Sequence, residues 1–294
     1  MSELVARAQL QLLAKAMHVD VAEVAFLERL PVDRLHELRQ RMSDAIFDAQ
    51  AEKFRRISRL VPIVPLKMAL PTIQKMVPPQ MAGRAAGAVA VAHPKKAIEA
   101  LSMLKPKYAA AAAPYLDPRA VEQIAHLAPA APVVAISNEV LARGDYFTAG
   151  LFVDYATPEL VRAIEAGVQD DEGILRAAAL VYSSATLSSI LRIIVEASPG
   201  RLSRVIKTTI DGPDDLKLAT LSVAVRVDDD LVGAVGDVLM TETPPEKITE
   251  LIELCAREDA LPEARTLVDR LSPQARAVFD ANEQAVALLH QGQP

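Results

Sequence analysis

The chain of 294 residues contains one cysteine, no tryptophan and only 4% aromatic residues. A single cysteine, Cys255, excludes an intramolecular disulfide and a metal site built from several thiolates, and it fits a reducing compartment. The scarcity of aromatics disfavours a surface that stacks sugars or nucleic-acid bases. Eleven glycines are few for this length, which disfavours an all-β fold with many tight turns. The apolar residues are mainly alanine, valine, leucine and isoleucine, a composition that suits closely packed helices.

Long hydrophobic runs and catalytic motifs are also absent. No stretch reaches the roughly 18 consecutive apolar residues of a membrane span. The first 25 residues carry Glu3, Asp20 and Glu23, which predict an amphipathic helix and not a signal peptide, so we expect a cytoplasmic protein. No Gly-rich phosphate loop, nucleophilic-serine motif or paired-histidine zinc motif occurs. The five histidines are scattered, and Cys255 lies among apolar neighbours, which favours a buried, unreactive thiol. The sequence therefore predicts no cofactor and favours a non-enzymatic protein, while it leaves catalysis open.

Prolines mark an internal repeat of about 40 residues. Each repeat proline is followed by apolar residues at the third and sixth positions: Pro118 by Val121 and Ile124, Pro158 by Val161 and Ile164, Pro199 by Leu202 and Val205, Pro245 by Ile248 and Leu251. Proline suits the first position of a helix, where its missing N–H would be unpaired in any case. Asp117, Thr157 and Ser198 precede three of these prolines and are residue types that cap helices. Each proline is therefore predicted to start a helix, and a poorer copy begins at Pro79.

The repeat predicts an all-α fold: a right-handed superhelix, or solenoid, of helical hairpins with a period of about 40 residues. Second helices are expected at 132–142, 174–182 and 216–226, with turns at 143–146 and 226–230, and some units are expected to hold three short helices. The small-xxx-small spacing of Gly83 and Gly87 predicts a close approach between helices.

The phrases "DPRAVEQI" and "TPELVRAI", within Ala/Leu-rich units of this length, resemble the superhelical cytoplasmic N-terminal domain of MgtE magnesium transporters and the helical repeats of the flagellar switch protein FliG. The resemblance covers residues 79 to 280 and implies a superhelical stack. It does not imply transport, because the MgtE membrane domain has no counterpart in this sequence. Acidic residues help bind magnesium in that family, and acidic clusters occur here at 170–172, 214–215 and 228–230. None matches a family motif residue by residue, so no metal ligand is predicted, and helix N-termini account for the negative charge.

Charge divides the chain into three predicted parts, which we expect to form one continuous elongated domain. Residues 1–52, the N-terminal helices, have a net charge of −3. Residues 53–107, a basic, proline-broken, apolar helical segment, have a net charge of +10 with Glu99 as their only acidic residue. Residues 108–294, the helical-repeat solenoid, have a net charge of −13.

The basic segment combines spaced cations with aliphatic residues and methionines, as an element at an anionic membrane surface does. The residues predicted to bind such a surface are Arg55, Arg56, Arg59, Lys67, Lys75, Lys95 and Lys96. An acidic protein partner, or docking on the acidic repeats or on another copy of the chain, stays open. Nucleic acid is disfavoured because no aromatic lies between Phe54 and Tyr108.

All five tyrosines lie between residues 108 and 182. Tyrosine offers an apolar body with a polar tip, which is common in binding surfaces. The residues predicted to bind a partner or ligand are Tyr115, Asn138, Arg143, Tyr146, Tyr155 and Tyr182; the alternative is that Tyr115 and Tyr155 pack the joints between helices. The sequence thus predicts a scaffold or adaptor for a protein partner, peripheral at the membrane through its basic segment, with homo-oligomerisation open. The alternative is a helical protein that holds an apolar small molecule or lipid near these tyrosines and acts on it.

Overall fold

The protein is helical throughout the residues that the computed structural model describes, which are 3–17, 19–58 and 61–291. These residues form twenty α-helices and three short 3-10 helices, with no strand, which confirms the predicted all-α class. Among them, no helix combines the length and the apolar composition that a membrane crossing requires.

Each repeat proline is the first residue of a helix, as the sequence predicted. The four helices are α8 (Pro118–Ala125), α11 (Pro158–Gly167), α14 (Pro199–Asp211) and α17 (Pro245–Arg257). The Asp117 carboxylate accepts from the Arg119 amide, and the Thr157 hydroxyl accepts from the Leu160 amide, so two of these helices have a side-chain cap. Pro79 starts α5 (Pro79–Ala92) in the same way.

Three helices lie between successive repeat prolines, which confirms the expected three-helix units and replaces the two-helix hairpins. The other helices of these units are α9 (Ala130–Ala142), α10 (Tyr146–Val153), α12 (Asp171–Leu180), α13 (Ser184–Ala197), α15 (Asp214–Ala224) and α16 (Asp229–Glu242). After α17 come α18 (Leu261–Asp269), α19 (Pro273–Asp280) and α20 (Glu283–Leu289). Helices α8 and α10 have only 8 residues each, which leaves room for a third helix in the unit.

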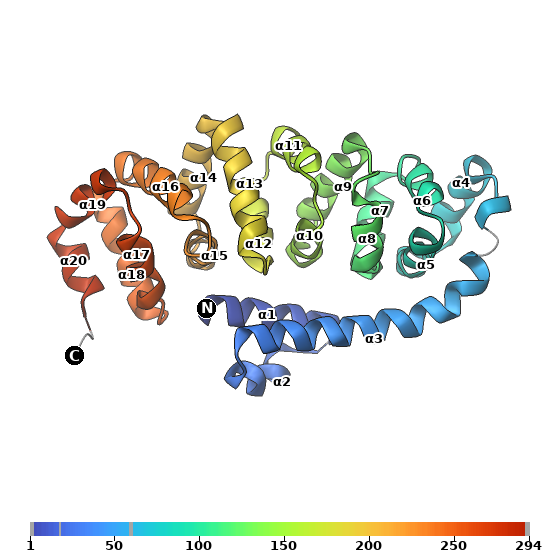
Figure 1. Ribbon diagram of the computed structural model, residues 1–294, viewed down its shortest axis with the longest axis horizontal. Helices are drawn as coiled ribbons and strands as arrows, with labels where there is room; N and C mark the ends of the chain where they lie inside the picture. Colours follow the sequence, from blue (N-terminus) through green and yellow to red (C-terminus); the bar gives the residue numbers. More distant parts are fainter. Residues whose placement is uncertain (1–2, 18, 59–60, 292–294) are drawn as a thin grey trace.

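Most of the repeat helices lie in two rows that follow chain order along the long axis of the molecule (Figure 1). Helices α14 and α17 belong to neither row: α14 packs against α12, α13, α15 and α16, and α17 packs against α15, α18 and α20. In the first row, α7 (Pro106–Ala112), α9, α11 and α13 each pack against the next, and the row continues through α16 and α19. In the second row, α8, α10, α12, α15 and α18 each pack against the next. The apolar core is divided accordingly into clusters along the array, each shared by neighbouring helices.

The N-terminal helices lie beneath the second row (Figure 1). They comprise α1 (Glu3–Met17), α2 (Val21–Val24), the 3-10 helix η1 (Ala25–Arg29) and the long α3 (Val32–Ser58). Helix α1 packs against α3, α12 and α15, and α3 packs against α1 and α5. Because α3 continues to Ser58, the predicted boundary between residues 52 and 53 falls inside a helix.

The basic segment forms the end of the array opposite α20 (Figure 1). Its elements are η2 (Val61–Ile63), α4 (Leu66–Met76), α5, α6 (Pro94–Leu101) and α7, followed by η3 (Ala113–Tyr115). Gly83 and Gly87 are buried on α5, and a Cβ added to Gly83 would lie 2.2 Å from the Ala112 carbonyl oxygen. A Cβ added to Gly87 would lie 3.0 Å from Asp117 Cβ. The predicted close approach between helices is therefore confirmed.

Candidate functional site

The six residues predicted to bind a partner or ligand are spread over several joints between helices. The Arg84 guanidinium lies 5.9 Å from the ring centre of Tyr115. Asn138 Nδ2 donates to the Gly167 carbonyl at 3.1 Å, and Arg143 donates to the Lys107 carbonyl at 2.8 Å. Each of these side chains therefore connects neighbouring helices of the array.

Of the other three tyrosines in this set, Tyr146 and Tyr182 contact side chains of other helices, and Tyr155 is partly buried. The Arg176 guanidinium lies 5.6 Å from the ring centre of Tyr146. Tyr155 is half-buried, and burial raises the pKa of its hydroxyl. The Tyr182 hydroxyl donates to Asp33 Oδ1 of α3 at 2.6 Å, across 149 residues of chain. Tyr182 thus belongs to the contact between the array and the N-terminal helices.

A polar network fixes the N-terminal helices to the array around Tyr182. The His36 ring stacks on the Tyr182 ring with centroids 3.6 Å apart and planes inclined by 12°. Gln9 of α1 is buried, and its Oε1 accepts from Arg39 Nε at 3.1 Å. Burial, together with the nearby Arg39 charge, lowers the pKa of His36 to about 4, so the imidazole is neutral at pH 7. Burial and the hydrogen bond to Asp33 raise the pKa of Tyr182 to about 12.

A second contact of α3 with the array is ionic. Arg119 at the start of α8 pairs with Asp48 at 2.9 Å and with Asp44 at 3.6 Å, and it also pairs with Asp117 at 2.9 Å. The acidic N-terminal helices are therefore held by an arginine of the repeat region. Sequence reasoning missed both contacts, because neither Arg119 nor Tyr182 has a local signal for a partner so distant in the chain.

The three acidic clusters start helices and pair with arginines. Asp170 caps α12, Asp214 and Asp215 lie in the first turn of α15, and Asp229 and Asp230 lie in that of α16, as the sequence predicted. The ion pairs that connect different repeat units include Arg176 with Asp215, Arg192 with Asp230, Arg257 with Asp214 and Arg270 with Asp229, at 2.5 to 2.6 Å. Within the described ranges, no group of three or more His, Cys, Asp or Glu side chains could hold a metal ion.

Arg201 is a buried arginine at one of these joints. It is 5% exposed and pairs with Asp171, also 5% exposed, at 2.9 Å. It also donates to the Val168 carbonyl at 2.7 Å and to the Glu165 carbonyl, so it holds the end of α11 as well as the start of α12. Arg204 provides a second cation to Asp171 at 2.5 Å.

The four lysines predicted to bind an anionic surface lie on α4 and α6, at the end of the array opposite α20. Lys67, Lys75 and Lys95 are exposed, whereas Lys96 pairs with Glu99 at 2.9 Å. Arg55 and Arg56 belong to α3, of which only the helical backbone is described at those positions, and Arg59 lies outside the described residues. Four large apolar side chains are exposed beside these lysines: Ile63 by 78%, Met68 and Met76 by 76% each, and Met81 by 52%.

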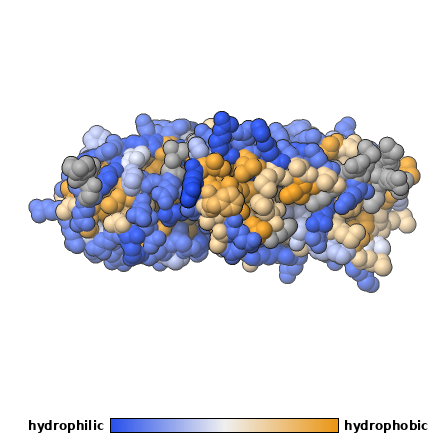
Figure 2. Space-filling view, turned by 90° about the horizontal axis from the view of Figure 1, so that it is seen from below, coloured by the Kyte–Doolittle hydropathy of each residue, from blue (hydrophilic) through white to orange (hydrophobic). Residues whose placement is uncertain are grey.

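A second exposed apolar surface lies on the N-terminal helices. It comprises Met17, Val21, Phe26 and Leu30, and we call it the Phe26 patch. Phe26 is 69% exposed, which is unusual for a phenylalanine. Asp20, Glu23 and Glu28 are exposed in the same segment. Figure 2, which views the molecule from the side of α2 and α3, shows apolar surface gathered near the middle of this face.

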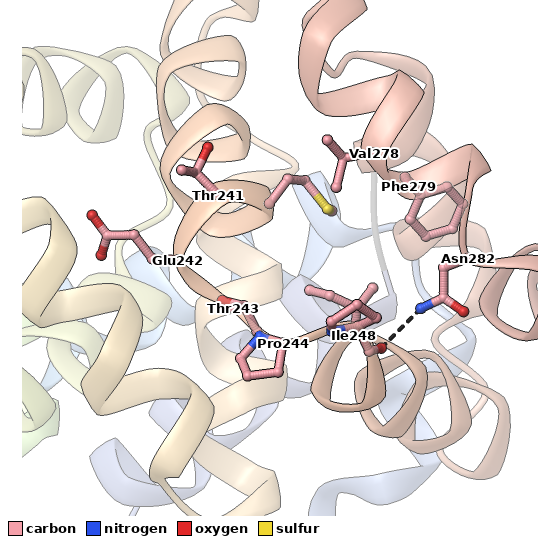
Figure 3. A pocket seen from close by; sticks show the side chains of 10 residues that line it. Thr241, Glu242, Thr243, Pro244, Ile248, Val278, Phe279 and Asn282 are labelled. Carbon is pink, nitrogen blue, oxygen red and sulfur yellow. Dashed lines mark hydrogen bonds between the residues drawn. The ribbon is translucent and has the colours of Figure 1, made fainter.

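An apolar pocket of about 370 Å³ lies between α16, α17 and α19. Figure 3 shows Ile248, Val278 and Phe279 around this space, whereas Glu242 points away from it. Asn282 at its edge donates to the Pro245 carbonyl at 2.8 Å. A larger and more polar hollow of about 450 Å³ adjoins Arg201 and Arg204. No tyrosine lines either of these two pockets, so neither is the predicted cavity near the tyrosines.

Cys255 and the histidines show no catalytic arrangement in the described part of the chain. Cys255 is buried as predicted, and burial raises the pKa of its thiol to about 12, which suppresses the thiolate at neutral pH. His93 Nε2 lies 3.0 Å from the Ser58 carbonyl oxygen, and His126 and His290 are exposed. His18 lies outside the described residues.

Comparison with known proteins gives no functional information, so a functional conclusion rests on the arrangement of side chains described above. No family model, no curated protein and no solved structure matches this chain. The resemblance to the MgtE N-terminal domain and to FliG therefore stays a prediction from the repeat pattern.

Proposed function

We propose that this protein is a non-enzymatic helical-repeat scaffold that binds a protein partner through the Phe26 patch. In this proposal the array from α5 to α20 is a solenoid, wound as a right-handed superhelix of units of about 40 residues. The two rows of helices in chain order support a solenoid, as do the ion pairs that join units at separations of 38 to 43 residues. The lone buried thiol is consistent with the cytoplasmic location that the sequence predicts.

The observation that carries the proposal is the 69% exposure of Phe26, in a segment where Met17, Val21 and Leu30 are exposed as well. Exposed apolar surface with a polar rim is typical of protein interaction sites, and aromatic residues are frequent among those that dominate binding energy. Three exposed carboxylates, of Asp20, Glu23 and Glu28, outnumber the one exposed cation of this segment, Arg29, so its net charge is negative. The partner therefore presents an apolar side chain surrounded by basic residues.

The test places a photo-crosslinking amino acid at Phe26 and, as a control, at Leu127, which is 44% exposed in another part of the chain. We expect one protein adduct at position 26, its loss when Val21→Ser and Leu30→Ser are added, and no such adduct at position 127. The same adduct at both positions, or none at position 26, would contradict the proposal.

Native mass spectrometry before and after organic extraction tests the alternative function. A bound apolar small molecule that is released by the solvent would instead favour a ligand-binding protein, with the pocket of Figure 3 as its site. Its walls at Met240, Ile248 and Phe279 are apolar, and its volume lies at the lower end of the range for small-molecule sites. In that case Phe279→Ala would weaken retention of the molecule, whereas Phe26→Ser would not.

A further inference from the structure

Helix α4 has one buried side and one exposed side. Leu66 and Leu70 are buried, at 8% and 6% exposure, and attach the helix to the array. The residues on the exposed side are Lys67, Met68, Pro71, Thr72, Lys75 and Met76, which recur at the spacing of a single helix face. The preceding η2 helix adds Ile63, which is 78% exposed. We call this surface, from Ile63 to Met76, the α4 face.

The α4 face is positively charged, and its lysines are not neutralised. Neither Lys67 nor Lys75 forms an ion pair with any carboxylate in the described part of the chain. Glu99 is the only acidic residue from 53 to 107, and it pairs with Lys96. Asp44 and Asp48 of α3 pair with Arg119. The positive potential of this end of the molecule is thus left for an external partner.

We propose that the α4 face binds the surface of a lipid bilayer that contains anionic headgroups. Lys67 and Lys75 contact the headgroups, and Ile63, Met68 and Met76 enter the outer part of the acyl layer. This inference rests on the proposed function, because it identifies the surface to which the scaffold is attached. The face lies at the end of the array opposite α20, so the rest of the array projects away from the membrane (Figure 1).

The arrangement of the α4 face suits a bilayer better than another macromolecule. Methionine side chains that are 76% exposed on a helix next to unpaired lysines can enter an apolar layer while each lysine keeps its ammonium group among the headgroups. A protein partner would need shaped contacts, and neither of the two pockets lies on this face. A nucleic acid would need aromatic side chains for stacking. Tyr108, an aromatic residue that contacts the end of α4, uses its hydroxyl to donate to the Val77 carbonyl at 2.8 Å.

The contribution of each group sets the size of the expected effects. A lysine near an anionic surface increases binding by a factor of about five. Loss of both Lys67 and Lys75 is therefore expected to weaken binding about 25-fold. Each partly inserted methionine is expected to contribute about a factor of ten, since an exposed methionine gains from burial of its apolar area.

The first test is co-sedimentation of the full chain with vesicles of phosphatidylcholine alone or with 30% phosphatidylglycerol. We expect binding only to the anionic vesicles and a loss of about 25-fold for Lys67→Gln with Lys75→Gln. The matched control is Arg162→Gln with Lys207→Gln, which removes the same charge from two exposed positions of α11 and α14. Equal weakening by both pairs of substitutions, or no binding to anionic vesicles, would overturn the proposal.

The second test uses the absence of tryptophan from the chain. Met68→Trp introduces a single fluorophore on the α4 face, and Gln284→Trp introduces one at an exposed position of α20. Anionic vesicles are expected to shift the emission of the first variant to shorter wavelength and to leave the second unchanged. Binding without this shift would refute insertion.

Sedimentation velocity without lipid tests whether the α4 face binds a second copy of the chain. The lipid proposal would be overturned if the protein does not bind vesicles but self-associates, and if Lys67→Gln with Lys75→Gln abolishes the self-association. The α4 face would then be a contact between two copies of the chain. Because the Phe26 patch and the α4 face involve separate residues, crosslinking at Phe26 and vesicle binding fail or succeed independently.

Discussion

Replacing Arg201 by methionine removes the guanidinium that joins two neighbouring repeat units. The substitution leaves the buried Asp171 carboxylate with Arg204 as its remaining cation, and it leaves the Val168 and Glu165 carbonyls without this donor. Removing one partner of a buried ion pair costs about 3 to 5 kcal/mol, because the other charge stays buried. Since Arg204 still contacts Asp171, we expect a loss of about 3 kcal/mol of local stability.

Hydrogen exchange measured by mass spectrometry is the appropriate assay, because an array of repeats can open unit by unit. Peptides from α11, α12 and α14 are expected to lose protection that corresponds to about 3 kcal/mol, while peptides from α5 and α7 keep theirs. The control Arg162→Met changes an exposed arginine of α11 and is expected to alter stability by less than about 0.5 kcal/mol. A loss below about 1 kcal/mol for Arg201→Met would refute the reasoning.

A double-mutant cycle separates the ion pair from the packing of the side chains. If Asp171 causes most of the loss, Arg201→Met combined with Asp171→Leu restores part of the stability, because the Asp171 carboxylate is no longer buried without Arg201. Glu165, which pairs with Arg201 at 3.6 Å, lacks that cation in the single and the double variant alike. A double variant whose loss equals the sum of the two single losses would show that the pair does not couple.

Three further predictions concern other parts of the fold. His36 has a pKa of about 4 in the folded protein and about 6.5 in the unfolded chain, so its contribution to stability is present above pH 6.5 and is lost as the pH falls toward 4. For a half-buried ring the loss of stability is about 1 kcal/mol. When urea midpoints at pH 7 and pH 4.5 are compared, this loss is expected to disappear in His36→Gln but not in His126→Gln. The Cys255 thiol is expected to resist alkylation by iodoacetamide at pH 8 until urea unfolds the chain, which the mass of the intact protein will show. Rapid alkylation of the folded protein would contradict the burial of Cys255. Gly83→Ala forces a Cβ against the Ala112 carbonyl and is expected to destabilise the protein by about 1 to 3 kcal/mol in thermal unfolding. The control Gly200→Ala is expected to be tolerated, because a Cβ there would meet no atom within 4 Å.

The helix starts could be predicted from the sequence because their cause is local. A proline at the first position and a capping side chain before it act within a few residues, and Pro118 and Pro158 with Asp117 and Thr157 follow this rule. The acidic clusters could be placed for the same reason, since carboxylates are favoured at helix N-termini. The number of helices in a unit was harder to predict, because helices as short as α8 and α10 leave little periodic pattern.

The roles of the tyrosines could not be predicted, because they depend on contacts between distant parts of the chain. Nothing near Tyr182 indicates that its hydroxyl donates to Asp33, and nothing near Arg119 indicates Asp48. The basic segment was recognised from its composition, but only the structure shows that Lys67 and Lys75 are exposed on the same face of α4 as Met68 and Met76. Composition identifies the charges of a segment, whereas exposure depends on how the helix packs.

The position of α1 has a consequence for the order in which the protein forms during synthesis. Most contacts of the array join helices close in the chain and can form as soon as each unit leaves the ribosome. The Glu3 amide, however, donates to Glu263 Oε1 of α18 at 3.1 Å, across 260 residues. At roughly 5 to 20 residues per second, α1 is made on the order of 10 to 50 s before this partner. Helix α1 is therefore complete long before its last contact can form, and the residues at its start wait for α18 in the interval.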